Sequence, residues 1–266
     1  MNTDIATPQH DTTEDALFKG RVLLRQPKSG YRFSVDTPLL IWFASQSGRF
    51  LQCADLGAGS GAVGIGLLAT SAVRHVVAVE LQARLAQLCM QNAQRNGFGD
   101  QLALLHGDMR QPHPQLSPKR FDLVVSNPPF WPADSGRLPA LEERRIARHE
   151  IAVTLGDVVA TASRLLQPGK GRFCIIFPAR RLADLMAALH HQHLHATRMC
   201  FVYPRKDEPA AWVLLQARHG NSECLDVMPP LVLKTEDGRD TSEGAHILSG
   251  AFSPALMACV DKRGLS

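Results

Sequence analysis

Long hydrophobic runs are missing from this chain of 266 residues. No apolar stretch reaches the ~18 residues of a membrane-spanning helix, so we expect no membrane association. The first 15 residues contain four acids but no lysine or arginine. That charge is wrong for a secretory signal or an organellar transit peptide, and the expected location is therefore the cytoplasm.

Paired cysteines are also missing. The six cysteines (Cys53, Cys89, Cys174, Cys200, Cys224 and Cys259) show no C-x-x-C spacing, which disfavours a disulfide framework or a zinc site. The histidine-rich stretch His190–His195 places His191 and His195 four residues apart. Because no carboxylate or cysteine accompanies them, we interpret the stretch as a helix end and expect no bound metal.

The bulk composition is that of an ordinary globular protein. Hydrophobic residues make up 45% of the chain and charged residues 20%. The net charge of +4 permits a nucleic-acid partner without requiring one. The length suits one large α/β domain or two small ones, and no linker or internal repeat marks a second domain.

Strand-like and helix-like segments alternate over the first two-thirds of the chain. We predict seven strands at 51–56, 75–80, 102–106, 121–126, 171–177, 197–203 and 211–217. This order predicts an α/β fold with a doubly wound, mostly parallel, seven-stranded Rossmann-like sheet. Only a short turn separates the last two strands, so they should form an antiparallel hairpin at the sheet edge.

The two ends of the chain have weaker patterns. Residues 1–19 are polar and unpatterned and are expected to be frayed. We therefore expect residues 1–30 to form a flexible or short N-terminal arm and residues 31–266 a single domain. A possible strand at 230–234 and a weak terminal helix around 251–260 close the chain.

A glycine-rich turn follows the first core strand. It reads Asp55-Leu-Gly57-Ala-Gly59-Ser-Gly61. Glycine lets the backbone turn tightly and approach a ligand closely, and the G-x-G-x-G spacing differs from the G-x-G-x-x-G of dinucleotide-binding folds.

Acids end the next two predicted strands. Glu80 follows Gly57 by 23 residues, close to the offset at which an acid meets ribose hydroxyls. Asp108 lies where it could accept a hydrogen bond from an adenine amine. Together with Asp55 these acids predict an adenosine-type cofactor and disfavour a nucleotide polyphosphate, which would require Lys and Arg.

The fourth predicted strand stops at two prolines, in Asn127-Pro128-Pro129-Phe130. Proline cannot donate to a strand ladder, so a stiff loop should begin at Asn127, at the edge of the sheet where α/β proteins bind ligands. The loop carries one amide side chain, that of Asn127, together with backbone carbonyls and the aromatic ring of Phe130.

These motifs, in this order, resemble class I S-adenosylmethionine-dependent methyltransferases. The resemblance covers about residues 30–217, and the Asn-Pro-Pro-aromatic loop is its most specific part. It implies S-adenosyl-L-methionine as cofactor and methylation of an amino or amide nitrogen. The cofactor would contact Asp55, Gly57, Gly59, Gly61, Glu80, Leu81, Asp108, Met109 and Asn127, and the catalytic loop would be Asn127, Pro128, Pro129 and Phe130.

The flanking segments are similar to the bacterial tRNA(Val) adenine-N6 methyltransferase family. They are Tyr31–Leu40, Arg144–His149 with Thr154-Leu155, and in the tail Arg205–Gln216, Pro230–Leu233 and Asp237-Gly238. This implies a tRNA partner and methylation of an adenine of the position-37 type. Alternatives that share the catalytic loop are protein glutamine-N5 methylation, RNA guanine-N2 methylation and a cofactor-binding protein without turnover. Oligomeric state cannot be read from the sequence.

Positive charge follows the catalytic loop. Arg144, Arg145 and Arg148 lie in the long excursion after Phe130, where an RNA backbone could pass. Further cations are expected near later strand ends, at Lys170, Arg172, Arg180, Arg181, Arg205 and Lys206.

Overall fold

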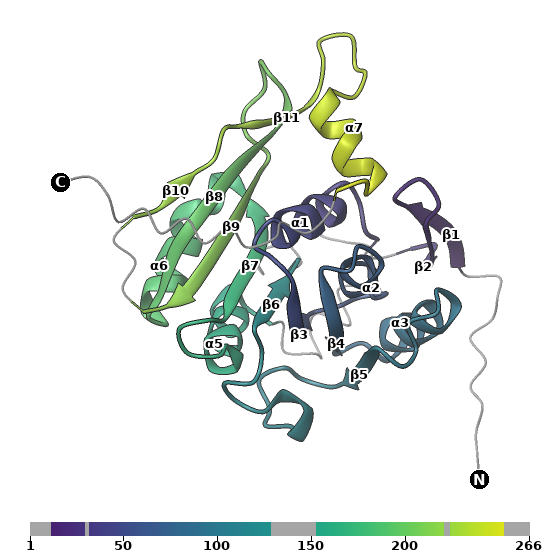
Figure 1. Ribbon diagram of the computed structural model, residues 1–266, viewed down its shortest axis with the longest axis vertical. Helices are drawn as coiled ribbons and strands as arrows, with labels where there is room; N and C mark the ends of the chain where they lie inside the picture. Colours follow the sequence, from purple (N-terminus) through teal and green to yellow (C-terminus); the bar gives the residue numbers. More distant parts are fainter. Residues whose placement is uncertain (1–11, 30–31, 129–152, 221–223, 253–266) are drawn as a thin grey trace.

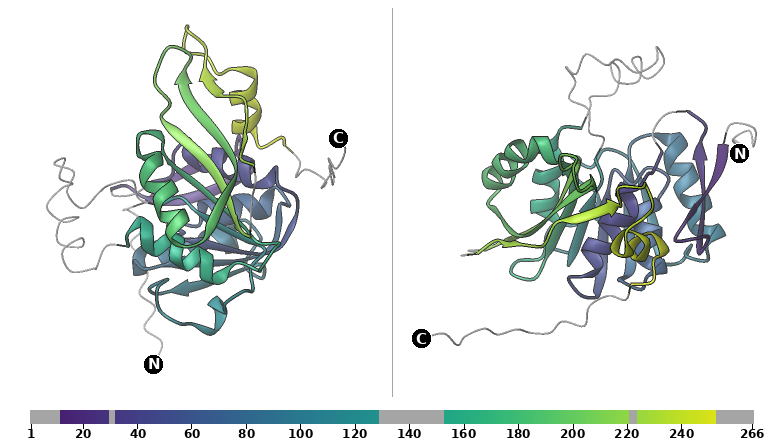
Figure 2. Two further views of the ribbon diagram at one scale, coloured as in Figure 1. Left: turned by 90° about the vertical axis from the view of Figure 1, so that its left-hand side faces the viewer. Right: turned by 90° about the horizontal axis from the view of Figure 1, so that it is seen from above.

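The computed structural model describes residues 12–29, 32–128, 153–220 and 224–252 (Figure 1). A central twisted sheet has helices on both faces (Figures 1 and 2). The seven predicted strands are β3 (Phe50–Leu56), β4 (Val73–Glu80), β5 (Leu102–His106), β6 (Leu123–Ser126), β7 (Arg172–Pro178), β8 (Leu194–Arg205) and β9 (Trp212–His219). The α/β fold is therefore confirmed.

The strand order is β10-β8-β9-β7-β6-β3-β4-β5, and β11 also pairs with β8. Strands β3 to β7 pair in parallel, whereas β9 is antiparallel to both β7 and β8. The antiparallel hairpin is present, but the sheet continues beyond it through β10 (Asp226–Val227) and β11 (Leu231–Lys234).

Strands in the centre of the sheet are mostly apolar because both faces are covered. Successive side chains point to opposite faces, so each strand contributes to two cores. In β6, Leu123 and Val125 face one core while Val124 faces the other. In β7, Cys174 faces the first of these cores and Ile175 faces the second.

The first core packs beneath α1 (Asp36–Ser45), α2 (Ala62–Ala69) and α7 (Ser242–Ser249), and α3 (Ala83–Arg95) contributes residues to it. The second core packs beneath α5 (Leu155–Leu165) and α6 (Leu182–His191), together with the short 3-10 turn η2 (Pro114–Leu116). A further 3-10 turn, η3 (Ala179–Arg181), links β7 to α6.

The expectation of a frayed terminus is wrong for residues 12–19. Strands β1 (Thr12–Leu17) and β2 (Val22–Pro27) form a separate antiparallel hairpin that packs against α2 and α3 (Figure 1). Two asparagines hold it: Asn92 of α3 exchanges hydrogen bonds with the backbone of Arg25, and Asn96, the C-cap of α3, with that of Leu23. These side chains satisfy the outer edge of β2 as a further strand would.

The end of the described chain also differs from expectation. Helix α7 follows β11, and its Thr241 cap accepts a hydrogen bond from the N–H of Gly244. The sequence analysis missed this helix and placed a weaker one at 251–260, most of which lies outside the described residues.

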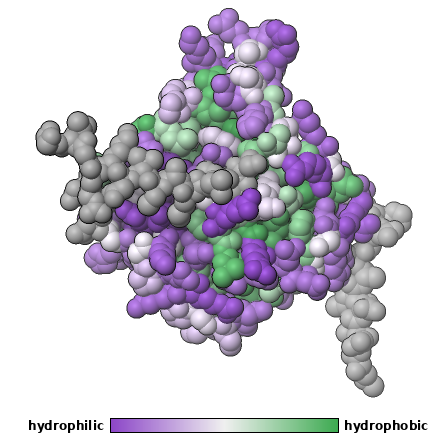
Figure 3. Space-filling model, in the orientation of Figure 1, coloured by the Kyte–Doolittle hydropathy of each residue, from purple (hydrophilic) through white to green (hydrophobic). Residues whose placement is uncertain are grey.

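No helix in the described ranges is both long and apolar enough to cross a membrane. On the face shown in Figure 3, hydrophobic areas lie between more numerous hydrophilic residues. Cys53, Cys89, Cys174 and Cys200 are free thiols buried in the first core.

Candidate active site at the carboxyl ends of the strands

The parallel strands β3, β4, β5 and β6 end side by side. Leu56 lies opposite Ser126 on one side and Val79 on the other, and Glu80 lies opposite His106. We call this border of the sheet the carboxyl-end edge. It gathers every predicted site residue that the structure describes, because each lies at or just after one of these strand ends.

The glycine turn after β3 depends on its glycines. Gly57, Gly59 and Gly61 have φ angles of +73°, +58° and +86°, which residues with a Cβ rarely adopt. The N–H groups of Gly57 and Ala58 both donate to the carbonyl of Val79 at 3.0 Å, which fixes the turn against β4. A Cβ at Gly57 would meet no atom within 4 Å, so the turn leaves open space beside its backbone.

Glu80 joins the glycine turn to the end of β4. One carboxylate oxygen accepts from the N–H of Gly59 and the other from the N–H of Gln82, each at 2.8 Å. Only 6% of the residue is exposed. A carboxylate oxygen has two lone-pair positions, so Glu80 can hold the turn and still accept from a ligand hydroxyl.

Asp55 lies beneath the turn. It is 1% exposed and accepts a hydrogen bond of 2.9 Å from the N–H of Gly64 in α2. Burial raises the pKa of Asp55 to about 7, the Gly64 bond opposes that shift, and the nearby charge of Glu80 adds to it. The position and hydrogen bond of Asp55 indicate that it stabilises the glycine turn.

Asp108 is engaged by a residue that the sequence analysis missed. Arg110 donates to both carboxylate oxygens of Asp108 through Nε and Nη2, at distances from 2.6 to 3.0 Å. These bonds lower the pKa of Asp108. Arg110 also lies 3.8 Å from Asp157, whose carboxylate completes the capping box of α5. An Asp-x-Arg spacing in the sequence was the available signal.

Asn127 and Pro128 follow β6 and are both buried, with Asn127 5% exposed. The preceding Ser126 donates from its hydroxyl to the carbonyl of Leu56 at 2.8 Å. This bond fixes the end of β6 to the end of β3, immediately before the glycine turn. Asn127 therefore leaves the sheet beside Gly57.

The remaining predicted site residues divide into two groups. Leu81 is half-buried after Glu80, and Met109 is buried, with its carbonyl accepting from Arg164 of α5. Pro129, Phe130, Arg144, Arg145 and Arg148 lie outside the described residues.

Helix α1 brings a further segment to the carboxyl-end edge. Its last residue leads through four residues to the start of β3, so its first turn lies at the opposite end, near the strand termini. α1 begins at Asp36, whose carboxylate accepts from the N–H groups of Ser34 and Thr37. The bonds hold the residues before α1 in a fixed turn.

The arrangement supplies several hydrogen-bond acceptors around one turn. Acids lie at the ends of β4 and β5, and an amide with a proline carbonyl follows β6. Such a set can bind hydroxyls and amines, and it has no cation within the glycine turn to favour phosphate. Among the described residues, no group of three or more His, Cys, Asp or Glu is arranged to hold a metal ion.

Comparison with known proteins assigns this architecture. The family model "Methyltransferase small domain" matches residues 34–176, which include α1 and every strand from β3 to β6. An Aeromonas hydrophila protein named tRNA1(Val) (adenine(37)-N6)-methyltransferase is 30% identical over 186 residues, covering 69% of this chain and 75% of the relative. A protein of the same name from Dyadobacter fermentans is 25% identical over 185 residues, covering 69% and 75%.

The fold has a counterpart among solved structures. An Agrobacterium tumefaciens protein described as a predicted O-methyltransferase superposes with a TM-score of 0.63 at 21% identity. The match covers 80% of this chain and 97% of that one. This chain belongs to the methyltransferase small domain family.

Proposed function

We propose that this protein is an S-adenosyl-L-methionine-dependent methyltransferase that methylates the N6 amine of an adenine in tRNA. The observation that carries the proposal is that the glycine turn and the end of β6 lie side by side at the carboxyl-end edge. The glycine turn, tied to Glu80 at 2.8 Å, lies beside Asn127 and Pro128 at the end of β6. The glycine turn and Glu80 would form the cofactor site. Asn127 and Pro128 would supply the oxygens that accept hydrogen bonds from the substrate amine.

The residues present fit this cofactor. Glu80 would accept from the ribose hydroxyls, and Asp108, held by Arg110, would accept from the adenine amine. The open space beside Gly57 leaves room for the cofactor against the backbone. When bound, S-adenosyl-L-methionine supplies an electrophilic methyl group on a sulfonium. Leu81 and Met109 would line the adenosine end.

Asn127 and Pro128 would position the substrate amine. An exocyclic adenine amine is a poor nucleophile because its lone pair is delocalised into the ring. The Asn127 side-chain oxygen and the Pro128 carbonyl would each accept one N–H bond, which orients the nitrogen and localises its lone pair. Proximity contributes much of the remaining rate enhancement. The proton released from the methylated nitrogen can pass to water, so this chain need not supply a dedicated base.

The names of the relatives support the choice of tRNA. Both relatives cited above are named for adenine-37 of tRNA1(Val), and a base within a folded RNA must leave its stack to reach a buried amide. Phe130 would stack on the displaced base, and Arg144, Arg145 and Arg148 would contact the RNA backbone. We propose a single domain for residues 31–266 and the cytoplasm as its location.

The test is methyl transfer from isotopically labelled S-adenosyl-L-methionine. The purified protein is incubated separately with tRNA lacking the modification, with total RNA and with protein extract. We expect label in tRNA, recovered as N6-methyladenosine after nucleoside digestion and mass analysis. Label in guanosine or in protein glutamine would overturn the adenine proposal in favour of a relative that shares the catalytic loop. If the protein binds the cofactor but transfers label to none of these substrates, it is a cofactor-binding protein without methyltransferase activity.

A further inference from the structure

The border opposite the active site carries a row of cations. We call it the amino-end edge, because β3, β4, β6 and β7 begin there and β9 ends there. Its cations are Arg49, Arg74, Lys119, Arg120, Lys170, Arg172 and Arg218. Lys170 and Arg172 were expected near strand ends, but they lie at the start of β7. The catalytic site therefore does not account for them.

Few acids oppose this row. Asp122 directs its carboxylate to the N–H groups of Leu51 and Gln52, at 2.7 and 2.8 Å, and Asp100 precedes β5. None of the cations in the row forms a side-chain ion pair with a described residue. Three arginines placed elsewhere, Arg110, Arg181 and Arg205, each pair with an acid within 3.0 Å. The edge therefore presents positive charge that the described part of the protein leaves uncompensated.

The cations are close enough to repel one another. Burial lowers the pKa of Arg172, and the charges of Arg218 and Arg198 lower it further. Arg218 follows Ala217, which lies opposite Phe173 in the sheet, so Arg172 and Arg218 occupy neighbouring strands. Like charges held side by side lower the affinity of each site for its proton, and an anion bound between them would relieve the repulsion.

The row has the regular spacing of the sheet. Its members belong to β9, β7 and β4 or lie within four residues before β7, β6 and β3, and these five strands are consecutive neighbours. Neighbouring strands lie about 4.8 Å apart, so the row is about 19 Å long. A nucleic-acid backbone is a ligand whose negative charges repeat along a comparable length.

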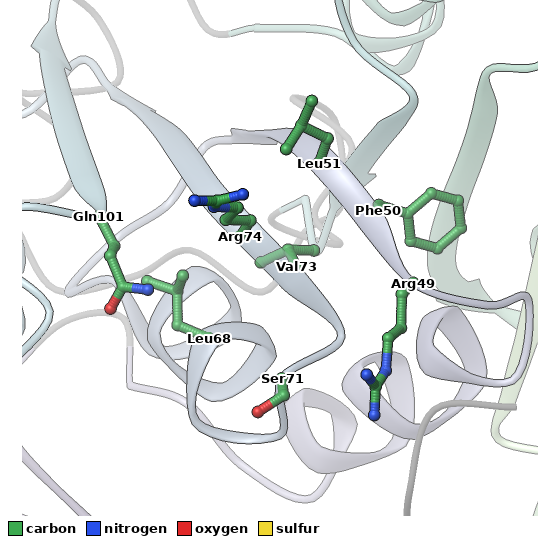
Figure 4. Close-up of a pocket in the computed structure, with 8 residues that line it drawn as sticks. All are labelled: Arg49, Phe50, Leu51, Leu68, Ser71, Val73, Arg74 and Gln101. Atoms are coloured by element: carbon green, nitrogen blue, oxygen red, sulfur yellow. The ribbon is translucent and has the colours of Figure 1, made fainter. Parts of the chain in front are cut away.

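One end of the row contains a hollow of about 440 Å³ (Figure 4). Arg49 and Arg74 lie on either side of Val73 in it, and Phe50 and Leu68 add apolar surface. The hydroxyl of Ser71 and the amide of Gln101 supply polar groups, while Leu51, 53% exposed, forms part of the rim. Apolar surface between two unpaired guanidinium groups suits a nucleotide, whose base is flat and whose phosphate is anionic.

We propose that the amino-end edge binds the phosphate backbone of the substrate RNA, with one nucleotide seated in the hollow between Arg49 and Arg74. The proposal rests on the RNA substrate proposed above. A seven-residue strand such as β3 spans about 23 Å, so this edge would contact RNA remote from the reacting adenine. Contacts of this kind position the RNA and add affinity without reading its sequence.

The test is a pair of double variants with the same change in net charge. Arg49→Glu/Arg74→Glu reverses two charges in the hollow, and Lys19→Glu/Arg239→Glu reverses two exposed charges outside the row. Binding of full-length tRNA is measured between 50 and 200 mM KCl. We expect the hollow variant to lose about tenfold or more in affinity at low salt and to reduce the slope of log Kd against log[KCl] by about 1 to 2. The control should remain within about twofold of the wild type, because non-contacting charges affect binding weakly.

A minimal substrate separates this proposal from the function itself. An RNA hairpin that carries only the reacting loop should be methylated equally by the wild type and the hollow variant, because it cannot reach the amino-end edge. If the wild type methylates no RNA but the tRNA affinities still differ as expected, the proposed function fails and the RNA surface stands.

Four results would overturn the RNA surface. Equal losses of tRNA affinity in both double variants would show that only the net charge of the protein matters. Unchanged tRNA affinity in the hollow variant would show that the hollow does not contact the RNA. Saturable binding of adenosine monophosphate or inorganic phosphate in the hollow, with no change in tRNA affinity, would assign it to a free nucleotide or ion. A change in sedimentation coefficient of the hollow variant from dimer to monomer would make the edge an interface between copies.

Discussion

The carboxylate of Glu80 accepts a hydrogen bond of 2.8 Å from the backbone N–H of Gly59, 21 residues earlier in the chain. This bond ties the turn after β3 to the end of the neighbouring strand β4. The residue proposed to bind the cofactor ribose therefore also shapes the loop against which the cofactor would lie. Ligand binding and loop order should respond together when Glu80 is changed.

Glu80→Ala is expected to weaken S-adenosyl-L-methionine binding by about tenfold or more, because it removes a charged acceptor and leaves a buried N–H unsatisfied. Glu80→Gln keeps one acceptor oxygen and should lose less. Titration calorimetry measures both affinities, and thermal unfolding of the ligand-free proteins shows how far the loop itself is disturbed. Equal affinities for all three proteins would contradict a role at the ribose.

Gly57→Ala and Gly61→Ala should differ in their effect on stability. Both place a Cβ at positive φ, which costs about 1 to 2 kcal/mol. At Gly61 the new Cβ would also lie 2.7 Å from the Sγ of Cys89, whereas at Gly57 it meets nothing within 4 Å. Urea denaturation should therefore show the larger loss for Gly61→Ala, by about a further 1 to 3 kcal/mol. In a Cys89→Ala background that additional loss should shrink, and an unchanged difference would show that steric contact is not its cause.

Asp55→Asn should change how stability depends on pH. The pKa of Asp55 is about 7 in the folded protein and near 3.8 when exposed, so between these values the folded state holds a proton that the unfolded state has lost. The contribution of this group to stability therefore falls as pH rises from about 4 to 7. Between pH 5.5 and 8, the wild type should lose on the order of 2 kcal/mol relative to Asp55→Asn, which cannot titrate. Parallel curves for the two proteins in denaturant titrations would contradict the raised pKa.

Asn127→Ala should reduce methyl transfer at least a hundredfold while leaving the Kd for S-adenosyl-L-methionine within a few-fold. The reason is that it removes an oxygen proposed to orient the substrate amine. Asn127→Asp retains an acceptor oxygen in the same place and serves as the matched control, with measurable residual transfer. Single-turnover methylation of tRNA and calorimetric cofactor binding give the two quantities. Loss of both in Asn127→Ala would mark the loop as structural.

Arg110→Ala should weaken cofactor binding in a pH-dependent manner. Arg110 lowers the pKa of Asp108, so removing it should raise that pKa towards its ordinary value. An ionised Asp108 is required to accept from the adenine amine. The decline in affinity on acidification, followed by titration calorimetry, should therefore begin at a higher pH in the variant than in the wild type. Arg110→Lys retains a positive charge but not the bidentate contact. Its affinity should begin to decline at a pH between those of the wild type and Arg110→Ala.

Much of the fold and site could be predicted from local patterns in the sequence. The glycine turn was predictable because its backbone angles require glycine, and the end of β6 because proline cannot continue a strand. The central strands were predictable because burial on both faces gives them apolar runs, such as Val76–Val79 in β4 and Phe173–Phe177 in β7. These features are all determined by residues near one another in the chain.

What the sequence analysis missed depends on partners distant in sequence. Strand β1 is mostly polar and shows no clear alternation of hydrophobic residues. Its hairpin is held by asparagines about 70 residues away. The charge row on the amino-end edge likewise gathers residues from Arg49 to Arg218, which only the order of the strands brings together. Arg110 lies two residues after Asp108, but the Asp-x-Arg spacing alone does not distinguish an ion pair from two solvated side chains.

Asn92 has one more partner beyond the hairpin. The same Nδ2 that donates to the carbonyl of Arg25 also donates to the carbonyl of Ser60, at 2.9 Å, within the glycine turn. A single fully buried amide thus fastens the first hairpin of the chain and the cofactor loop to one point on α3. A protein shortened to begin at α1 would deprive that amide of both its hydrogen bonds to Arg25. We expect such a shortened enzyme to fold with a loosened glycine turn, so the catalytic unit begins at the hairpin and not at the first helix.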